Sequence, residues 1–444
     1  MKLGKIFSSA AACWTLWFAV TPGPAGAQFS FEQEPFHYNK ATPTDRVARL
    51  NARLAAGEAK LDFDEKHGYL AAVLKLLDVP ASSQTLVYSK TSFQQKRIHP
   101  RAPRALYFAD DVYIGWVQGG DVVEASAVDP QLGAVFYTLD QRPSERPQFA
   151  RQTYDCTQCH ASALTGGVPG HIVRSVYPAP DGTPILKHGS FVVDHTTPIR
   201  KRWGGWYVSG EHGSQKHLGN LLVRGEDNAE RLASGDFDMG DRANVTDLRS
   251  RFDVSPYLSP HSDLVALLVI EHQTMAHNAI AQAYYQGRLA LRDEAVMNEA
   301  LGRPADYRSD SSQRRLDNIA AQLVKVLLFV DEAPLAEPIR GASSFAEEFV
   351  KAGPRDASGR SLRDFDLKTR LFRYPCSYLI YSDAFAGLSR DVKQIVYRKL
   401  GDVLADTNAD PAYKQLSAED RKAIREILLA TVDDLRAAWE AAAK

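Results

Sequence analysis

Two cysteines and a histidine in one pentapeptide are the residues of this sequence with the clearest capacity for chemistry. Cys156, Cys159 and His160 form a C-x-x-C-H pattern, which is typical of covalent haem attachment. Two thiols at this spacing on a helical turn can reach the two vinyl groups of one haem, and the adjacent imidazole can then bind the iron. The pattern therefore predicts one covalently bound haem c, with His160 as the proximal ligand.

Other interpretations of the pentapeptide stay open. A thioredoxin-like redox pair has the same C-x-x-C spacing, but it needs a βαβ context and gives His160 no role. A zinc site would need further ligands at suitable spacing, which other histidines of the chain could supply. The pattern is also short enough to occur by chance. We favour haem attachment because an independent feature, an export signal at the N-terminus, agrees with it.

The first 27 residues have the three parts of a secretory signal peptide. Lys2 and Lys5 give a positive start, an apolar stretch covers residues 6–20, and residues 25–27 form a small-x-small cleavage site. The apolar stretch is interrupted by two serines and is short for a membrane anchor. We therefore expect cleavage and export to the periplasm, where haem c is attached. No later apolar stretch approaches spanning length, so we expect no membrane span in the mature chain.

Around the pentapeptide the sequence resembles the c-type cytochromes. The resemblance covers the motif and its helical surroundings rather than the whole chain. It implies that Cys156 and Cys159 are the haem-linked thiols and His160 the proximal ligand. A longer pattern, at residues 204–207 and 272–274, is similar to exported cytochrome-domain proteins of unassigned role. The function that the resemblance implies is electron transfer with a periplasmic redox partner protein.

The sequence leaves the sixth iron ligand open. Small c-type cytochromes use a Met in a Pro-containing loop downstream, and none of Met239, Met275 and Met297 follows that pattern. Nine of the twelve histidines lie in the stretch that begins with the motif and ends at residue 277. From these we select His272 and His217 as candidate distal ligands. An open distal position would instead suit a haem enzyme of the peroxidase or oxygenase type, or a haem-based sensor.

A haem enzyme would need an acid–base group and a cation near the iron. Glu271, His272 and Arg174 are candidate catalytic residues of the right types. Glu271 continues a helical stripe of apolar residues that includes Leu268 and Met275. A carboxylate on a buried face is costly unless it is paired, and such a position often marks a site. The alternative is a structural brace, in which a nearby Arg or His holds the carboxylate.

A segment rich in aromatic and basic residues supplies further candidates for haem contact. Residues 200–207 read Arg-Lys-Arg-Trp-Gly-Gly-Trp-Tyr. Trp203 and Trp206 could cover the apolar face of the haem, and Arg202 could pair with a propionate. The alternative is a surface loop whose Trp residues fill the junction between two parts of the chain.

The spacing of apolar residues predicts an α+β fold. Residues 28–225 form a mixed region with short antiparallel strands and the motif, and residues 226–444 form a mainly α-helical region that could pack on the haem. We expect strands at 86–88, 105–108, 112–117, 122–128, 134–139, 172–177 and 191–194. We expect helices within 44–79 and at 261–286, 312–332, 388–405 and 417–443.

Charge and cysteine content narrow the function further. The 53 basic and 54 acidic residues are well mixed, which gives no reason to expect nucleic acid or a membrane surface as a partner. Only three cysteines follow the signal peptide, too few for a disulfide scaffold, and we expect Cys376 to be a buried free thiol. Residues 236–241 are similar to a calcium loop but lack its register and its closing Glu.

Overall fold

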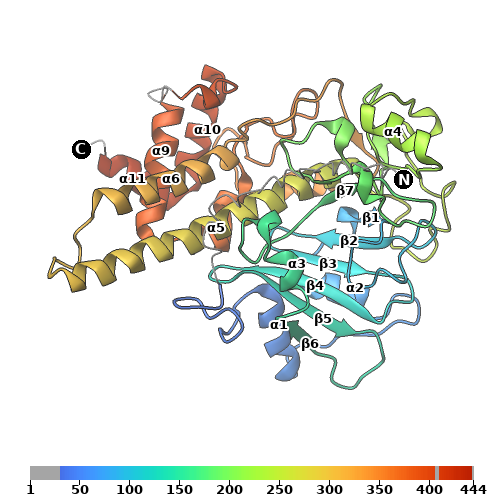
Figure 1. Cartoon of the computed structure of the whole chain (residues 1–444), viewed down its shortest axis with the longest axis horizontal. Coiled ribbons are helices and arrows are strands. Elements are labelled where there is room, and N and C mark those ends of the chain that lie inside the picture. Colours follow the sequence, from blue (N-terminus) through green and yellow to red (C-terminus); the bar gives the residue numbers. More distant parts are fainter. Residues whose placement is uncertain (1–30, 406–409, 443–444) are drawn as a thin grey trace, which may run out of the picture.

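A seven-stranded antiparallel sheet forms the N-terminal half of the protein (Figure 1). The computed structural model describes residues 31–405 and 410–442, so the predicted signal peptide, residues 1–27, lies outside the described residues. The strand order is β6-β5-β4-β3-β2-β1-β9. The strands are β1 (Thr85–Val87), β2 (Arg104–Phe108), β3 (Val112–Trp116), β4 (Val122–Asp129), β5 (Gly133–Asp140), β6 (Phe149–Gln152) and β9 (Trp206–Tyr207).

The predicted α+β class, with short antiparallel strands before a mainly helical part, is confirmed. Each of the five strands expected between residues 86 and 139 overlaps one of β1 to β5. Two further two-stranded antiparallel pairs lie outside the main sheet: β7 (Arg174–Val176) with β8 (Ser190–Val192), and β10 (Gly210–Glu211) with β11 (Arg340–Gly341). The first pair corresponds to the strands expected at 172–177 and 191–194.

The two faces of the sheet pack against different parts of the chain. Because side chains alternate along a strand, Ala125 and Val135 lie on the face that packs on α1 (Arg46–Ala55) and α2 (Leu70–Leu76). Tyr113 and Val128 belong instead to a second cluster of buried apolar residues, shared with the long helix α5 (Leu264–Ala300). One apolar core therefore joins the second face of the sheet to the helical half.

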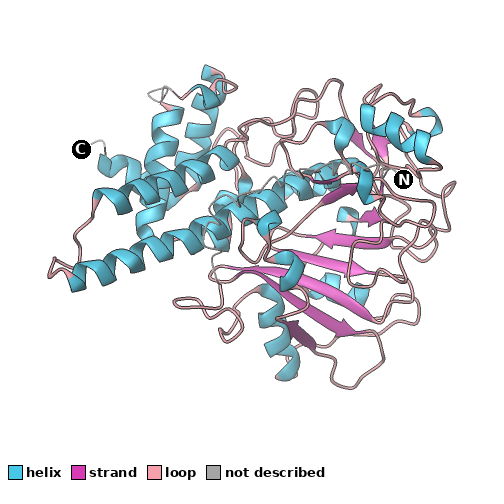
Figure 2. Ribbon diagram, in the orientation of Figure 1, coloured by secondary structure: helices cyan, strands magenta, loops and turns pink. Residues whose placement is uncertain are grey.

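The C-terminal half is mainly helical, and Figure 2 shows most of its helices gathered to one side of the sheet, with the helix of residues 226–234 apart from them. Asp263 begins α5 because its side chain accepts from the backbone N–H groups of Val265 and Ala266. The helices are α4 (Glu226–Ser234), α5, α6 (Asp310–Leu327), α7 (Phe345–Lys351), α8 (Asp383–Ala386), α9 (Arg390–Leu404), α10 (Ala418–Thr431) and α11 (Asp433–Ala442).

One helical stretch is interrupted where the apolar pattern predicted a continuous helix. The C-terminal helix expected at 417–443 is two helices, because Val432 is extended with φ −125° and ψ 94°. Asp433 and Asp434 then stand in the first turn of α11, where acidic side chains stabilise a helix. Near the N-terminus, an irregular segment separates α1 from α2. None of the described helices, in residues 31–405 and 410–442, is long and apolar enough to cross a membrane.

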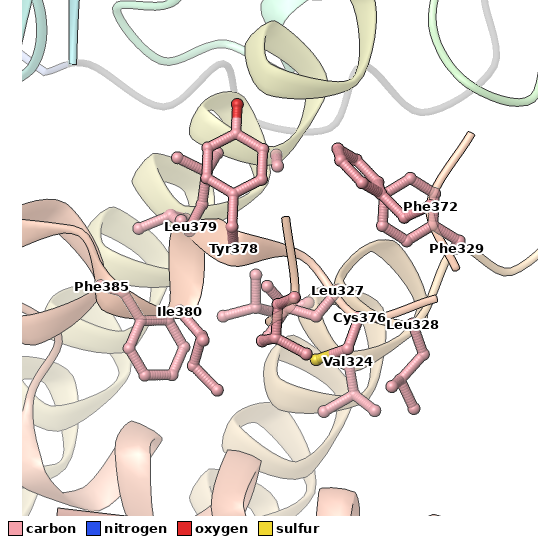
Figure 3. Close-up of a cluster of buried hydrophobic side chains, with 14 of the residues drawn as sticks. Val324, Leu327, Leu328, Phe329, Phe372, Cys376, Tyr378, Leu379, Ile380 and Phe385 are labelled. Atoms are coloured by element: carbon pink, nitrogen blue, oxygen red, sulfur yellow. The ribbon is translucent and has the colours of Figure 1, made fainter. Parts of the chain in front are cut away.

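Cys376 is a free thiol with no exposed surface, as expected from the sequence. It lies among apolar side chains of α6 and of the segment that follows Phe372, as Figure 3 shows. Burial raises the pKa of this thiol to about 12, so it stays neutral. Its position indicates a packing role.

Candidate functional site

The C-x-x-C-H motif forms a single helical turn, α3 (Thr157–His160), that lies over the main sheet (Figure 1). The backbone N–H groups of Cys159 and His160 both donate to the carbonyl of Cys156. Thr157 is buried and anchors the turn through a 2.8 Å bond from its hydroxyl to the carbonyl of Thr153. Both thiols are free, Cys159 is exposed and Cys156 is half-buried. The turn therefore offers two unpaired thiols at the surface.

The imidazole of His160 is oriented by a hydrogen bond from Nδ1 to the carbonyl of Gly170, 3.0 Å away. A carbonyl oxygen only accepts, so Nδ1 carries the proton and the lone pair of the neutral ring lies on Nε2. Burial lowers the pKa of His160, which keeps the ring neutral at pH 7. Metal-binding histidines are commonly oriented by such a bond to their other nitrogen. Nε2 of His160 is thus the ring nitrogen left available as a ligand atom.

A clamp from α5 holds the carbonyl of Gly170 in place. The side-chain amide of Asn278 accepts from the N–H of His171 at 2.8 Å and donates to its carbonyl at 2.7 Å. Gln282 donates to the carbonyl of Thr165 at 3.2 Å. A Cβ at Gly170 would collide with Asn278 Oδ1, so this close approach requires glycine. The helical half therefore positions the backbone that orients His160.

Aromatic rings connect the motif to the interior. The ring of Phe136 on β5 lies 4.9 Å from that of His160 and 6.1 Å from that of His171. The ring of His171 lies 4.3 Å from that of Tyr113, whose hydroxyl is 2.9 Å from Nδ1 of His277. His171 follows Gly170 directly, so it adjoins the group that faces Nδ1 of His160.

A cavity of about 270 Å³ lies beside the motif segment. Leu164 and Gly166 line it from the segment after α3, Val192 from β8, and Met275 from α5. Leu164 is 51 % exposed and Val192 39 % exposed, and Tyr154, just before the motif, is 72 % exposed. Leu164 and Val192 therefore place exposed apolar surface at this cavity.

The residues present fit a covalently attached haem. Two free thiols and a neutral, oriented imidazole supply its covalent and axial bonds. The exposed apolar side chains around the motif would be covered by a flat apolar ring system. Among residues 31–405 and 410–442, no group of three or more His, Cys, Asp or Glu side chains is arranged to hold a metal ion by itself.

The candidate residues Glu271 and Arg202 form a buried ion pair away from the surface. Nη1 of Arg202 lies 2.8 Å from Oε2 of Glu271, and both side chains are almost completely buried. Arg202 also donates to the carbonyls of Thr197 and His195, at 2.6 and 3.0 Å. The guanidinium is thus engaged within the protein, and the contacts are those of the structural brace.

The candidate distal ligands His272 and His217 each have both ring nitrogens in hydrogen bonds. Nδ1 of His272 is 2.9 Å from Nδ1 of His195, and its Nε2 is 2.8 Å from the hydroxyl of Ser377. Nδ1 of His217 accepts from the N–H of Gly219, and its Nε2 lies 3.2 Å from Nε2 of His212. In this arrangement neither histidine has a free nitrogen for an axial bond.

Trp203, Trp206 and Arg174 lie where the sheet meets its neighbouring loops. Trp203 is 1 % exposed, and its ring lies 5.1 Å from that of His217. Trp206 is in β9 and its indole N–H donates to the carbonyl of Arg174 at 2.7 Å. The guanidinium of Arg174 binds the hydroxyl of Ser190 on β8. Residues 202–207 are therefore buried, and the segment ends in the main sheet rather than forming a surface loop.

Comparisons with known proteins give no family for this chain. No family model matches it, no curated protein matches it, and no solved structure matches it.

Two residues of the site, Gly170 and Asn278, were not selected from the sequence. Their role is known only from the contacts that they make. The glycines at 166, 167 and 170 are the one local signal, because they indicate close backbone approach directly after the motif.

The buried carboxyl of Glu271 predicts a specific pH dependence of stability. Burial raises its pKa to about 7 even though Arg202 opposes the shift. Because this folded-state pKa lies above the ordinary value, ionisation of Glu271 destabilises the fold, and stability is lost as pH rises from about 4.5 through 7. We expect Glu271→Gln to remove this loss. The difference in unfolding free energy between the variant and the wild type should therefore shift in favour of the variant by a few kcal/mol as pH rises from about 4.5 through 7. Urea unfolding at pH 5 to 8 measures the difference, and parallel curves would contradict it.

Proposed function

We propose that this protein is an exported monohaem c-type cytochrome, with haem held by Cys156 and Cys159 and ligated by His160. The observation that carries the proposal is the bond from Nδ1 of His160 to the carbonyl of Gly170, which leaves Nε2 as the ligand atom. Free thiols on the same turn support it. When bound, haem supplies a one-electron redox centre.

We propose electron transfer with a periplasmic partner protein as the role of this centre. Cys159 is exposed, and the apolar side chains of Tyr154 and Leu164 flank the turn at the surface. A haem attached to this turn would have one edge at the surface, where another protein can approach it. The balanced charge of the chain, with 53 basic and 54 acidic residues, gives no reason to expect nucleic acid as the partner.

A second function, haem catalysis or ligand sensing at an open iron position, is favoured by one observation. Both nitrogens of His272 and of His217 are engaged in hydrogen bonds within the core. If no other side chain replaces them, the distal position is open to small molecules. The residues around the motif would then control the access of small molecules to the iron.

The absorption spectrum of the protein after periplasmic expression tests both functions. We expect a c-type spectrum in the ferric and ferrous states. A ferrous spectrum unchanged by carbon monoxide would mean a filled sixth position and would support electron transfer. A high-spin spectrum that shifts with carbon monoxide would support the second function. The absence of a haem band, where a control cytochrome matures, would refute haem attachment.

The clamp on Gly170 predicts a change in the haem spectrum when Asn278 is replaced. Asn278→Ala leaves the backbone N–H and carbonyl of His171 without their partner, which should cost about 2 kcal/mol. It should also weaken the orientation of His160 and shift the ferrous absorption bands.

Asn51→Ala is the matched control for this variant. Asn51 makes the same pair of bonds to the backbone of Phe149 on the edge strand β6, at 2.9 and 3.1 Å. We expect a similar loss of stability in urea with an unchanged spectrum. Equal spectral shifts in the two variants would show that Asn278 acts only on stability.

A further inference from the structure

A second cavity, of about 520 Å³, lies apart from the motif segment. It is bounded by α2, by the end of β2, by α7 and by Gln273 of α5. Three phenyl rings form much of its wall: the centroids of Phe108 and Phe345 are 5.5 Å apart, and those of Phe345 and Phe349 are 5.6 Å apart. A mostly apolar cavity of this size with a few polar groups is typical of a small-molecule site.

One cation is fixed at the wall of this cavity. Arg363 is only 4 % exposed, and its guanidinium lies 4.5 Å from the ring centroid of Phe349 and 4.4 Å from that of Tyr378. A Cβ at Gly353 would lie 2.6 Å from Cδ of Arg363, so glycine leaves the room that this side chain occupies. Two ring faces and a close backbone therefore hold the guanidinium in one position.

The hydrogen-bonding capacity of Arg363 is only partly used. Nη2 is paired with the carboxylate of Asp110, whose side chain is 50 % exposed. Nε is buried and has no hydrogen-bond partner. A buried N–H without a partner is costly, and a guanidinium presents its donors in a planar fork that matches a carboxylate. The guanidinium of Arg363 is thus suited to bind an anion in addition to Asp110.

Two other polar groups of the wall, Gln273 and Glu348, have partners of their own. Gln273 donates to the carbonyl of Ala109 and to the hydroxyl of Tyr113, and accepts from the hydroxyl of Tyr378. Glu348 accepts from the hydroxyls of Ser82 and Ser344.

At the rim, one arginine pairs with two carboxylates. Nη2 of Arg46 lies 3.4 Å from Asp78 and its Nη1 lies 3.0 Å from Asp111. Among the buried side-chain donors of the wall, Nε of Arg363 is therefore the one without a partner in the described residues. Lys75 is an exposed cation that also lines the cavity.

We propose that this cavity binds a small aromatic carboxylate, with the carboxylate at Arg363 and the ring against Phe108, Phe345 and Phe349. The ring supplies apolar area that the phenyl walls cover. The carboxylate accepts, in a charge-assisted bond, from the part of the Arg363 guanidinium that lines the cavity. This site does not depend on haem attachment, and either proposal can fail without the other.

Isothermal titration of the haem-loaded protein with 2-naphthoate tests the site, because a two-ring acid suits a cavity of this size. We expect saturable binding at one site, with the neutral isostere 2-naphthamide weaker by about tenfold or more, since a hydrogen bond to a charged group is lost. Arg363→Met should weaken naphthoate by a similar factor and make the two probes bind alike. Ala352→Trp should abolish binding of both, because Ala352 is an exposed residue of the cavity wall and a large ring there fills the space.

Arg340→Met is the control, since this arginine pairs with Glu211 at the surface and is 75 % exposed. It should leave binding unchanged. The proposal is overturned if naphthoate does not bind saturably, if it binds no better than naphthamide, or if Ala352→Trp binds as the wild type does. The last outcome would place the bound probe elsewhere even if Arg363→Met failed to fold.

Discussion

Replacing Cys156 and Cys159 together by alanine is expected to abolish covalent haem attachment and to leave the fold intact. Both thiols are free, one is exposed and the other half-buried, so their removal costs little packing. The loss of haem should be complete because the two thiols are the only cysteines of the motif. Mass spectrometry of the denatured protein measures attachment, since a covalent haem stays with the chain.

The single variants and Cys376→Ala complete this test. Cys156→Ala or Cys159→Ala leaves one thiol, so we expect a lower yield of protein with haem bound by a single bond. Cys376→Ala removes a buried thiol of the helical core and should keep full attachment with a modest loss of stability. Haem that remains attached through denaturation in the double variant would mean that the motif is not its site.

The sequence predicted those parts of the structure that depend on local pattern. The strands β1 to β5 follow from short runs of β-branched and aromatic residues separated by turns. Gly119 has φ +62°, as expected in the tight turn that joins β3 to β4. The helical turn at the motif was likewise predictable, since Cys156 and His160 are four positions apart.

The environment of each candidate histidine could not be predicted, because it is set by residues far along the chain. His272 lies on a helix of apolar residues, but its partners His195 and Ser377 are 77 and 105 positions away. Asn278, which holds the backbone at His171, is 107 positions from it and has no local signal. Apolar periodicity reports which face of a helix is buried, and not which polar group will meet it there.

Arg202→Met is expected to lower the unfolding free energy at pH 8 by about 3–5 kcal/mol, the range for one partner lost from a buried ion pair. Arg202 is 2 % exposed, and its partner Glu271 has no exposed surface. Without the guanidinium, the carboxylate must be buried unpaired or must take up a proton, and either outcome favours the unfolded state at high pH. Urea unfolding at pH 5 and pH 8 measures the loss. Arg340→Met, at the exposed pair with Glu211, should cost less than about 1 kcal/mol.

The pH dependence of the stability loss distinguishes two roles of Arg202: its charge pairing with Glu271 and its hydrogen bonds to backbone carbonyls. Removal of the cation raises the pKa of Glu271 further above its ordinary value, so the loss should be larger at pH 8 than at pH 5, where the carboxyl binds a proton more readily in the fold. Arg202→Met combined with Glu271→Gln should recover part of the loss at pH 8, since no charge is then buried. An equal loss at both pH values would mean that Arg202 acts mainly through the carbonyls of Thr197 and His195, which it also binds.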